Sequence, residues 1–148
     1  MHILQMVAEK GKPRLLIVDD EPDMLDFLER VFRGEYAVTR AASAEEALHE
    51  LDHKKYALVI TDQKMPHTTG VELLERIGDR YPFLVKVLLS GFTEVPEIQR
   101  AVERCGIHNY VVKPVDSERL RAAVREAIER HKRGRALFDS NAREKVDT

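Results

Sequence analysis

The sequence has little of what marks several large classes of protein. Its 148 residues include one cysteine, Cys105, so no internal disulfide can form, which fits the reducing environment of the cytoplasm. The apolar runs are only a few residues long, too short to cross a bilayer or to form the core of a signal peptide. The net charge is −2, so charge alone gives no reason to expect binding to nucleic acid or to a membrane.

Two common kinds of small-molecule site are also missing from the pattern. No G-x-G-x-x-G or GK[ST] segment follows a predicted strand, which argues against a protein that binds a nucleotide or flavin. The six histidines show no metal-ligand spacing and no catalytic partner, so we expect them to be surface residues.

The apolar residues switch repeatedly between two periodicities. Short aliphatic runs predict strands covered on both faces, and shorter mixed runs predict edge strands. The five predicted strands are Leu15–Val18, Tyr36–Val38, Leu58–Ile60, Val87–Leu89 and Tyr110–Val112. Between them, apolar residues three or four apart predict helices. We expect these helices to begin at Pro22, after an N-cap at Ser43, after Gly70, at Pro96 (ending near Gly106), and after an N-cap at Ser117.

Five strand–helix units in strict alternation predict the fold class. They favour an α/β fold with a doubly wound, five-stranded parallel sheet and helices on both faces. The strand order expected for five such units is 2-1-3-4-5, which places strands 1 and 3 side by side in the centre. Ligands of such sheets bind beyond the carboxyl ends of the strands, where the winding reverses.

Polar residues stand where those strands end. Asp19 and Asp20 follow the first strand, Asp62 ends the third, Ser90 the fourth and Lys113 the fifth. Three carboxylates close together need a compensating cation, and oxygen ligands favour Mg²⁺. Lys113 suits a phosphate, and no base is placed to activate the serine or a water, so a carboxylate is the simplest nucleophile. The set therefore indicates phosphoryl transfer.

Four segments, LLIVDDEP, TDQKMPHTTG, LLSGF and YVVKP, resemble the signature segments of the response-regulator receiver domain of two-component signalling. The resemblance covers roughly residues 13–131, and TDQKMP, LLSGFTE and GIHNYVVKPVD are further similar to receivers linked to hydrogenase control and to HD-type phosphodiesterases. It implies a flavodoxin-like receiver at residues 13–133, after an extension at 1–12 and before a tail or the start of a linker at 134–148. Gly134 weakens helical continuity there, and we lean towards a stand-alone receiver rather than a piece of a longer regulator.

The resemblance also implies a role for each signature residue. Asp62 is the expected phosphoacceptor, receiving a phosphoryl group from the phosphohistidine of a histidine kinase or a phosphotransfer protein. Asp20 is expected to bind Mg²⁺ directly and Asp19 through water, together with Asp62 and the backbone carbonyl of Lys64. Lys113 would contact the phosphoryl group, and the proline that follows it, Pro114, would be cis. Ser90 and Tyr110 would act as the switch pair.

Phosphorylation would then remodel the surface at residues 96–131 for a downstream protein or effector domain, or for a second copy of the chain. The chain is expected to be a cytoplasmic signalling module rather than an enzyme, with no direct contact to nucleic acid or membrane. Two alternatives remain open. One is a Mg²⁺-dependent aspartyl phosphohydrolase, and the other is a receiver that is never phosphorylated and serves only to bind proteins.

Overall fold

The structure, a computed structural model, describes residues 11–91, 96, 98, 99, 101, 102, 107, 109–114 and 116–147, with side chains up to residue 134. Five strands and four helices follow one another in the order β1 (Arg14–Val18), α2 (Pro22–Phe32), β2 (Ala37–Ala41), α3 (Ala44–His53), β3 (Leu58–Asp62), α4 (Gly70–Ile77), β4 (Val85–Ser90), β5 (Asn109–Val112) and α6 (Ser117–Asp147). Residues 96, 98, 99, 101 and 102, between β4 and β5, are also helical.

All five strands belong to one parallel sheet with the order β2-β1-β3-β4-β5, which confirms the predicted fold class. The register aligns the carboxyl ends of the strands. Val18 at the end of β1 pairs with Thr61, Asp62 pairs with Leu89, and Ser90 pairs with Val112. As a result, the residues that follow β1, β3, β4 and β5 all emerge at the same edge of the sheet.

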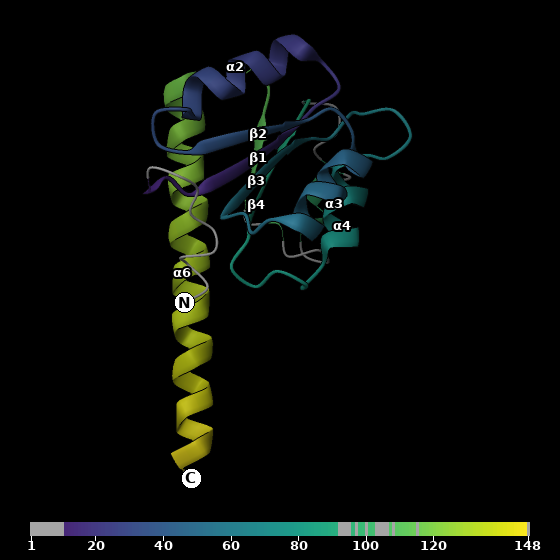
Figure 1. Ribbon diagram of the computed structural model, residues 1–148. Coiled ribbons are helices and arrows are strands. Elements are labelled where there is room, and N and C mark those ends of the chain that lie inside the picture. Colours follow the sequence, from purple (N-terminus) through teal and green to yellow (C-terminus); the bar gives the residue numbers. More distant parts are fainter. Residues whose placement is uncertain are drawn as a thin grey trace.

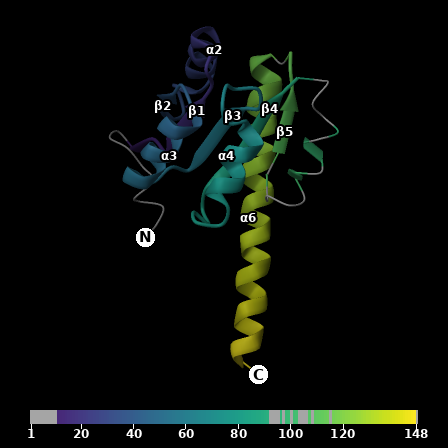
Figure 2. The same cartoon turned by 90° about the vertical axis from the view of Figure 1, so that its right-hand side faces the viewer.

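Helices cover both faces of the sheet (Figures 1 and 2). On one face, α3, α4 and the helical residues 98 and 101 pack over alternate strand residues such as Leu16, Val59 and Leu88. On the other face, α2 and α6 cover Leu15, Ile60 and Val87. Successive residues of a strand point to opposite faces, so the unbroken aliphatic runs serve two separate cores.

Four strands extend beyond their predicted runs by one or two residues at one or both ends, and two other boundaries need correction. The second strand is Ala37–Ala41 rather than Tyr36–Val38, because backbone pairing with β1 continues past the apolar residues through Thr39 and Arg40. The cap of α6 is Asp116 rather than Ser117, since the Asp116 carboxylate accepts a hydrogen bond from the Arg119 backbone N–H at 2.8 Å. Both corrections concern edge or cap positions, where polar residues carry no periodic signal.

Other helix predictions hold. Pro22 lies at the start of α2, and the Ser43 hydroxyl accepts a hydrogen bond from the Glu46 backbone at 3.2 Å. The helix expected from Pro96 is helical at its described residues, whereas its expected end at Gly106 lies outside them. α4 has a capping box between Thr69 and Glu72 that the pattern did not indicate.

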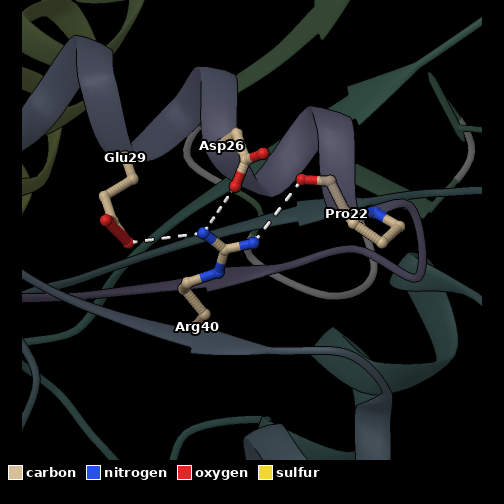
Figure 3. Close-up of polar contacts among 4 residues, drawn as sticks. All are labelled: Pro22, Asp26, Glu29 and Arg40. Atoms are coloured by element: carbon tan, nitrogen blue, oxygen red, sulfur yellow. Dashed lines mark hydrogen bonds and ion pairs between the residues drawn. The ribbon is translucent and has the colours of Figure 1, made fainter.

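Arg40, on the edge strand β2, links this strand to the start of α2 through hydrogen bonds and ion pairs (Figure 3). Its guanidinium donates to the Asp26 carboxylate at 2.7 Å and to the Pro22 carbonyl at 3.5 Å, and it lies 3.7 Å from Glu29. The Pro22 carbonyl belongs to the first turn of α2, which directly follows the acidic residues 19–21. This group of contacts therefore helps to hold the chain where it leaves the carboxyl end of β1.

α6 extends well past the edge of the sheet. It runs through Gly134 without a break to Asp147, and its second half extends beyond the sheet with no other described element beside it (Figures 1 and 2). Gly134, which was expected to weaken the continuity of this helix, does not interrupt it. The division of the chain into extension, domain and tail stays a prediction. Among the described residues, none of the helices combines the length and apolarity that a membrane span requires.

Candidate functional site

Three carboxylates meet at the carboxyl ends of β1 and β3. Asp19, Asp20 and Asp62 each offer an oxygen, and these oxygens lie within 4.8 Å of one another. Asp19 and Asp62 are 1% and 5% exposed, whereas Asp20 faces solvent. Neighbouring parallel strands that end at the same level produce this cluster, because Val18 and Thr61 are paired and the next residue of each chain is an aspartate.

Asp19 is the most unusual of the three. One of its oxygens accepts the Glu21 backbone N–H at 3.0 Å, while the other, Oδ2, is buried without a partner among the described residues. The pKa of Asp19 is raised from 3.8 to about 6, mainly by burial. The charges of Asp62 and Asp20 also raise this pKa, whereas the hydrogen bond from Glu21 and the charge of Lys113 lower it. A buried carboxylate oxygen without a partner is costly, so this atom indicates a place for a cation.

Lys113 supplies the positive charge of the site. Its ammonium lies 2.5 Å from the Asp62 Oδ1 atom, and its side chain remains 30% exposed. The backbone N–H of Lys113 donates to the Ser90 carbonyl at 2.8 Å, so the end of β4 fixes the start of the loop that carries the lysine. The peptide between Lys113 and Pro114 is cis, as the resemblance implied.

Ser90 and Tyr110 occupy neighbouring strands. Ser90 is fully buried, and its hydroxyl has no hydrogen-bond partner among the described residues. Tyr110 is half-buried against the core on the α3–α4 face, and its hydroxyl accepts a hydrogen bond from the Gln99 side chain at 3.2 Å. The switching role of the pair stays a prediction.

The segment from β3 to the start of α4 contains two residues, Gln63 and Gly70, that were not predicted to support the site. Gln63 is buried beside Asp62, its side-chain oxygen accepts the Val71 backbone N–H at 2.8 Å, and its carbonyl accepts the Gly70 N–H at 3.0 Å. A Cβ atom at Gly70 would lie 2.3 Å from the Asp62 carbonyl oxygen, so only glycine fits there. Together these contacts hold the loop that contains Lys64, whose side chain is exposed.

The donor set fits Mg²⁺. All the groups that converge are hard oxygens, which Mg²⁺ and Ca²⁺ prefer, and no histidine or cysteine lies among them. The orphaned Asp19 oxygen and the two further carboxylates supply the negative charge that a divalent ion requires. The Lys64 carbonyl belongs to the same loop, and its assignment as a ligand stays a prediction.

The arrangement also suits a phosphoryl group. The Asp62 carboxylate is buried, paired with an ammonium and flanked by a buried hydroxyl on the next strand. A carboxylate held in this way can act as a nucleophile while nearby cations neutralise phosphoryl oxygens. The structure thus brings together Asp19, Asp20, Asp62 and Lys113 as the sequence predicted.

Comparisons with known proteins agree with this geometry. A family model described as the response regulator receiver domain matches residues 15–125. The hydrogenase transcriptional regulatory protein HoxA of Cupriavidus necator is 36% identical over 115 residues, covering 78% of this chain and 24% of that protein. The transcriptional regulatory protein GlrR of Escherichia coli is 33% identical over 116 residues, covering 78% of this chain and 26% of that protein. The chain thus spans about a quarter of these relatives.

Solved structures show the same fold. The signal receiver domain of an HD domain-containing protein from Pseudomonas fluorescens is 31% identical, with a TM-score of 0.74 over 82% of this chain and 98% of that one. A response regulator receiver domain protein from Clostridium thermocellum is 28% identical, with a TM-score of 0.72 over 80% of this chain and 96% of that one.

Proposed function

This chain belongs to the response regulator receiver family, and on that premise we propose that it is the phosphoacceptor of a two-component phosphorelay. Asp62 would receive the phosphoryl group from the phosphohistidine of a histidine kinase or of a phosphotransfer protein. The observation that carries the proposal is the cluster of three carboxylates within 4.8 Å, with the Lys113 ammonium 2.5 Å from Asp62.

In the proposed step, an Asp62 oxygen forms a bond to phosphorus while the bond between phosphorus and the kinase histidine breaks, and the imidazole leaves. Lys113 binds a phosphoryl oxygen after exchanging its contact with Asp62, and the Ser90 hydroxyl, which has no partner among the described residues, donates to another. Asp19, Asp20, Asp62 and the Lys64 carbonyl would hold Mg²⁺, which when bound would offset negative charge on the phosphoryl oxygens.

The signalling step follows from the position of Ser90. If its hydroxyl turns towards the phosphoryl group, space is released beside β5, and Tyr110 can move inward from its half-buried position. The surface at residues 96–131 would change and present a new face to a downstream protein, an effector domain or a second copy. Its output is a change of binding partner in the cytoplasm rather than turnover of a metabolite.

Intact-protein mass measurement tests the proposal. The chain is incubated with Mg²⁺ and acetyl phosphate, and we expect one phosphoryl adduct that is labile in acid and alkali. Asp62→Asn should abolish the adduct, whereas Asp23→Asn, which changes an exposed acid in the first turn of α2, should leave it intact. An adduct that persists in Asp62→Asn would place the acceptor elsewhere.

The same experiment separates the alternatives. A receiver used only for binding proteins would show no adduct with any phosphodonor. An aspartyl phosphohydrolase would instead release phosphate over many turnovers from a substrate present in excess. We favour the phosphoacceptor, because the nucleophile candidate follows β3 and the carboxylates, ammonium and hydroxyl are all in place.

A further inference from the structure

α3 lies on the same face of the sheet as α4 (Figure 2). Two histidines of α3 lie side by side. His49 and His53 are four residues apart, so they project from one side of the helix one turn from each other. Their ring centroids are 4.2 Å apart with an angle of 38° between the planes, and both residues are exposed. This spacing contradicts the expectation that the histidines have no metal-ligand spacing.

A backbone hydrogen bond fixes which ring nitrogen of His53 is available. The Nδ1 atom of His53 lies 2.7 Å from the His49 carbonyl oxygen. A carbonyl can only accept, so Nδ1 carries the hydrogen, and the neutral ring presents the lone pair of Nε2 outward. Metal-binding histidines are commonly oriented in this way, with one ring nitrogen donating to a carbonyl and the other facing the ion.

The charged residues within α3 itself are acidic, whereas Lys54, at the C-cap, directly follows His53. α3 carries the four acidic residues Glu45, Glu46, Glu50 and Asp52 and no lysine or arginine. The hollow beside His49, about 350 Å³, is lined by three of these glutamates and by Arg40. Arg40 is engaged with Asp26 and Glu29 on α2, so its charge is largely directed to other carboxylates.

These acidic residues provide charge rather than ligands. The Glu46 carboxylate accepts the Ala42 N–H, Glu50 accepts the Tyr56 hydroxyl, and Asp52 accepts the Tyr81 hydroxyl. Glu45, the fourth, accepts the Thr68 hydroxyl at 3.4 Å and lies 3.9 Å from Arg76. Their interactions leave the two imidazoles as the groups on this side of α3 that are ready to bind an ion.

We propose that His49 and His53 form a chelating site for a divalent late transition-metal ion such as Ni²⁺, Cu²⁺ or Zn²⁺. Imidazole nitrogens suit these ions, whereas Mg²⁺ prefers oxygen, so the site is chemically separate from the acidic pocket at residues 19, 20 and 62. Water completes the coordination. An ion held here links two consecutive turns at the end of α3 and stabilises that helix.

The test measures Ni²⁺ binding to the untagged full chain by calorimetric titration and by retention on immobilised Ni²⁺. We expect His49→Gln and His53→Gln each to weaken binding at least tenfold, because a chelate needs both rings. His67→Gln, which removes another exposed histidine, should leave the affinity unchanged. Circular dichroism checks that each variant is folded.

A second variant separates spacing from composition. The double exchange H53K/K54H keeps the number of histidines and lysines but moves the second imidazole away from the i, i+4 position. It should bind as weakly as His53→Gln. Wild-type affinity in this exchange, or in both single variants, would overturn the proposal. Loss of Ni²⁺ binding in Asp62→Asn would also overturn it, by placing the ion in the acidic pocket.

Discussion

Replacing Asp19 by asparagine should make the metal-free protein more stable at neutral pH. The Asp19 carboxylate is buried, one of its oxygens has no partner among the described residues, and its pKa is raised from 3.8 to about 6. A shift of about 2 units corresponds to a cost of about 3 kcal/mol for holding the ionised group in the folded state. Asparagine removes the charge and keeps a side-chain oxygen that can accept the Glu21 N–H.

The sign of the pH dependence follows from the raised pKa. Below about pH 4 the carboxylate is protonated in both folded and unfolded chains, and the cost is absent. Between pH 4 and pH 6 the unfolded chain ionises first, so this group makes the folded state progressively less stable. Above pH 6 the full cost is present. The gain in stability from Asp19→Asn should therefore be about 1 to 3 kcal/mol at pH 7.5 and small at pH 4. It can be less than the full cost of about 3 kcal/mol, because the neutral amide accepts the Glu21 hydrogen bond more weakly than the carboxylate does.

Urea unfolding followed by circular dichroism, in EDTA at pH 7.5 and pH 4, measures the difference. The chain has no tryptophan, so circular dichroism is the natural signal. Asp79→Asn, at an exposed position far from the cluster in sequence, is the matched control and should show no such pH-dependent gain. A variant that is less stable than the wild type at pH 7.5, or one equally stabilised at both pH values, would refute the reasoning. Adding Mg²⁺ should stabilise the wild type more than the variant, because binding relieves the same cost.

Three further substitutions test the framework around the site. Gly70→Ala should lower the free energy of unfolding by about 1–3 kcal/mol or more, because its Cβ would lie 2.3 Å from the Asp62 carbonyl oxygen. Thermal melts measure this loss. The control Gly134→Ala should show none, since a Cβ at Gly134 meets nothing within 4 Å. Ser43→Ala should cost about 1 kcal/mol in urea titrations, since it removes the 3.2 Å cap of α3, and an unchanged midpoint would contradict that role. Gln63→Leu should cost about 1–3 kcal/mol by leaving a backbone N–H of α4 unpaired and should slow phosphorylation by acetyl phosphate, whereas a normal rate would show that this contact does not position the loop.

Much of the fold could be predicted because the central strands bury both faces. The runs that became β1, β3 and β4 are almost wholly aliphatic, so their positions follow from hydrophobicity alone. The edge strand β2 was placed less well, since backbone pairing extends through the polar residues Thr39 and Arg40. Gly134 was expected to weaken the continuity of α6, yet the helix passes through it. One glycine costs a helix only about 1 kcal/mol.

The candidate site was predicted to the extent that it depends on strand ends. Asp19, Asp62 and Lys113 follow apolar runs, and parallel strands must bring such residues to one edge. The unpaired Asp19 oxygen and the close approach at Gly70 could not be predicted, because both depend on how tightly the loops pack. The neighbouring rings of His49 and His53 became evident only once α3 was seen to place them on one side.

Because α6 is long, a small change in its direction at the first turn displaces its far end by a large distance. Its 31 residues rise by about 46 Å, and it begins only four residues after Lys113. A tilt of about 10° at its first turn would carry the opposite end sideways by about 8 Å, as simple trigonometry on that rise shows. Any rearrangement around β5, however slight, would thus be magnified severalfold at the distal end of the rod.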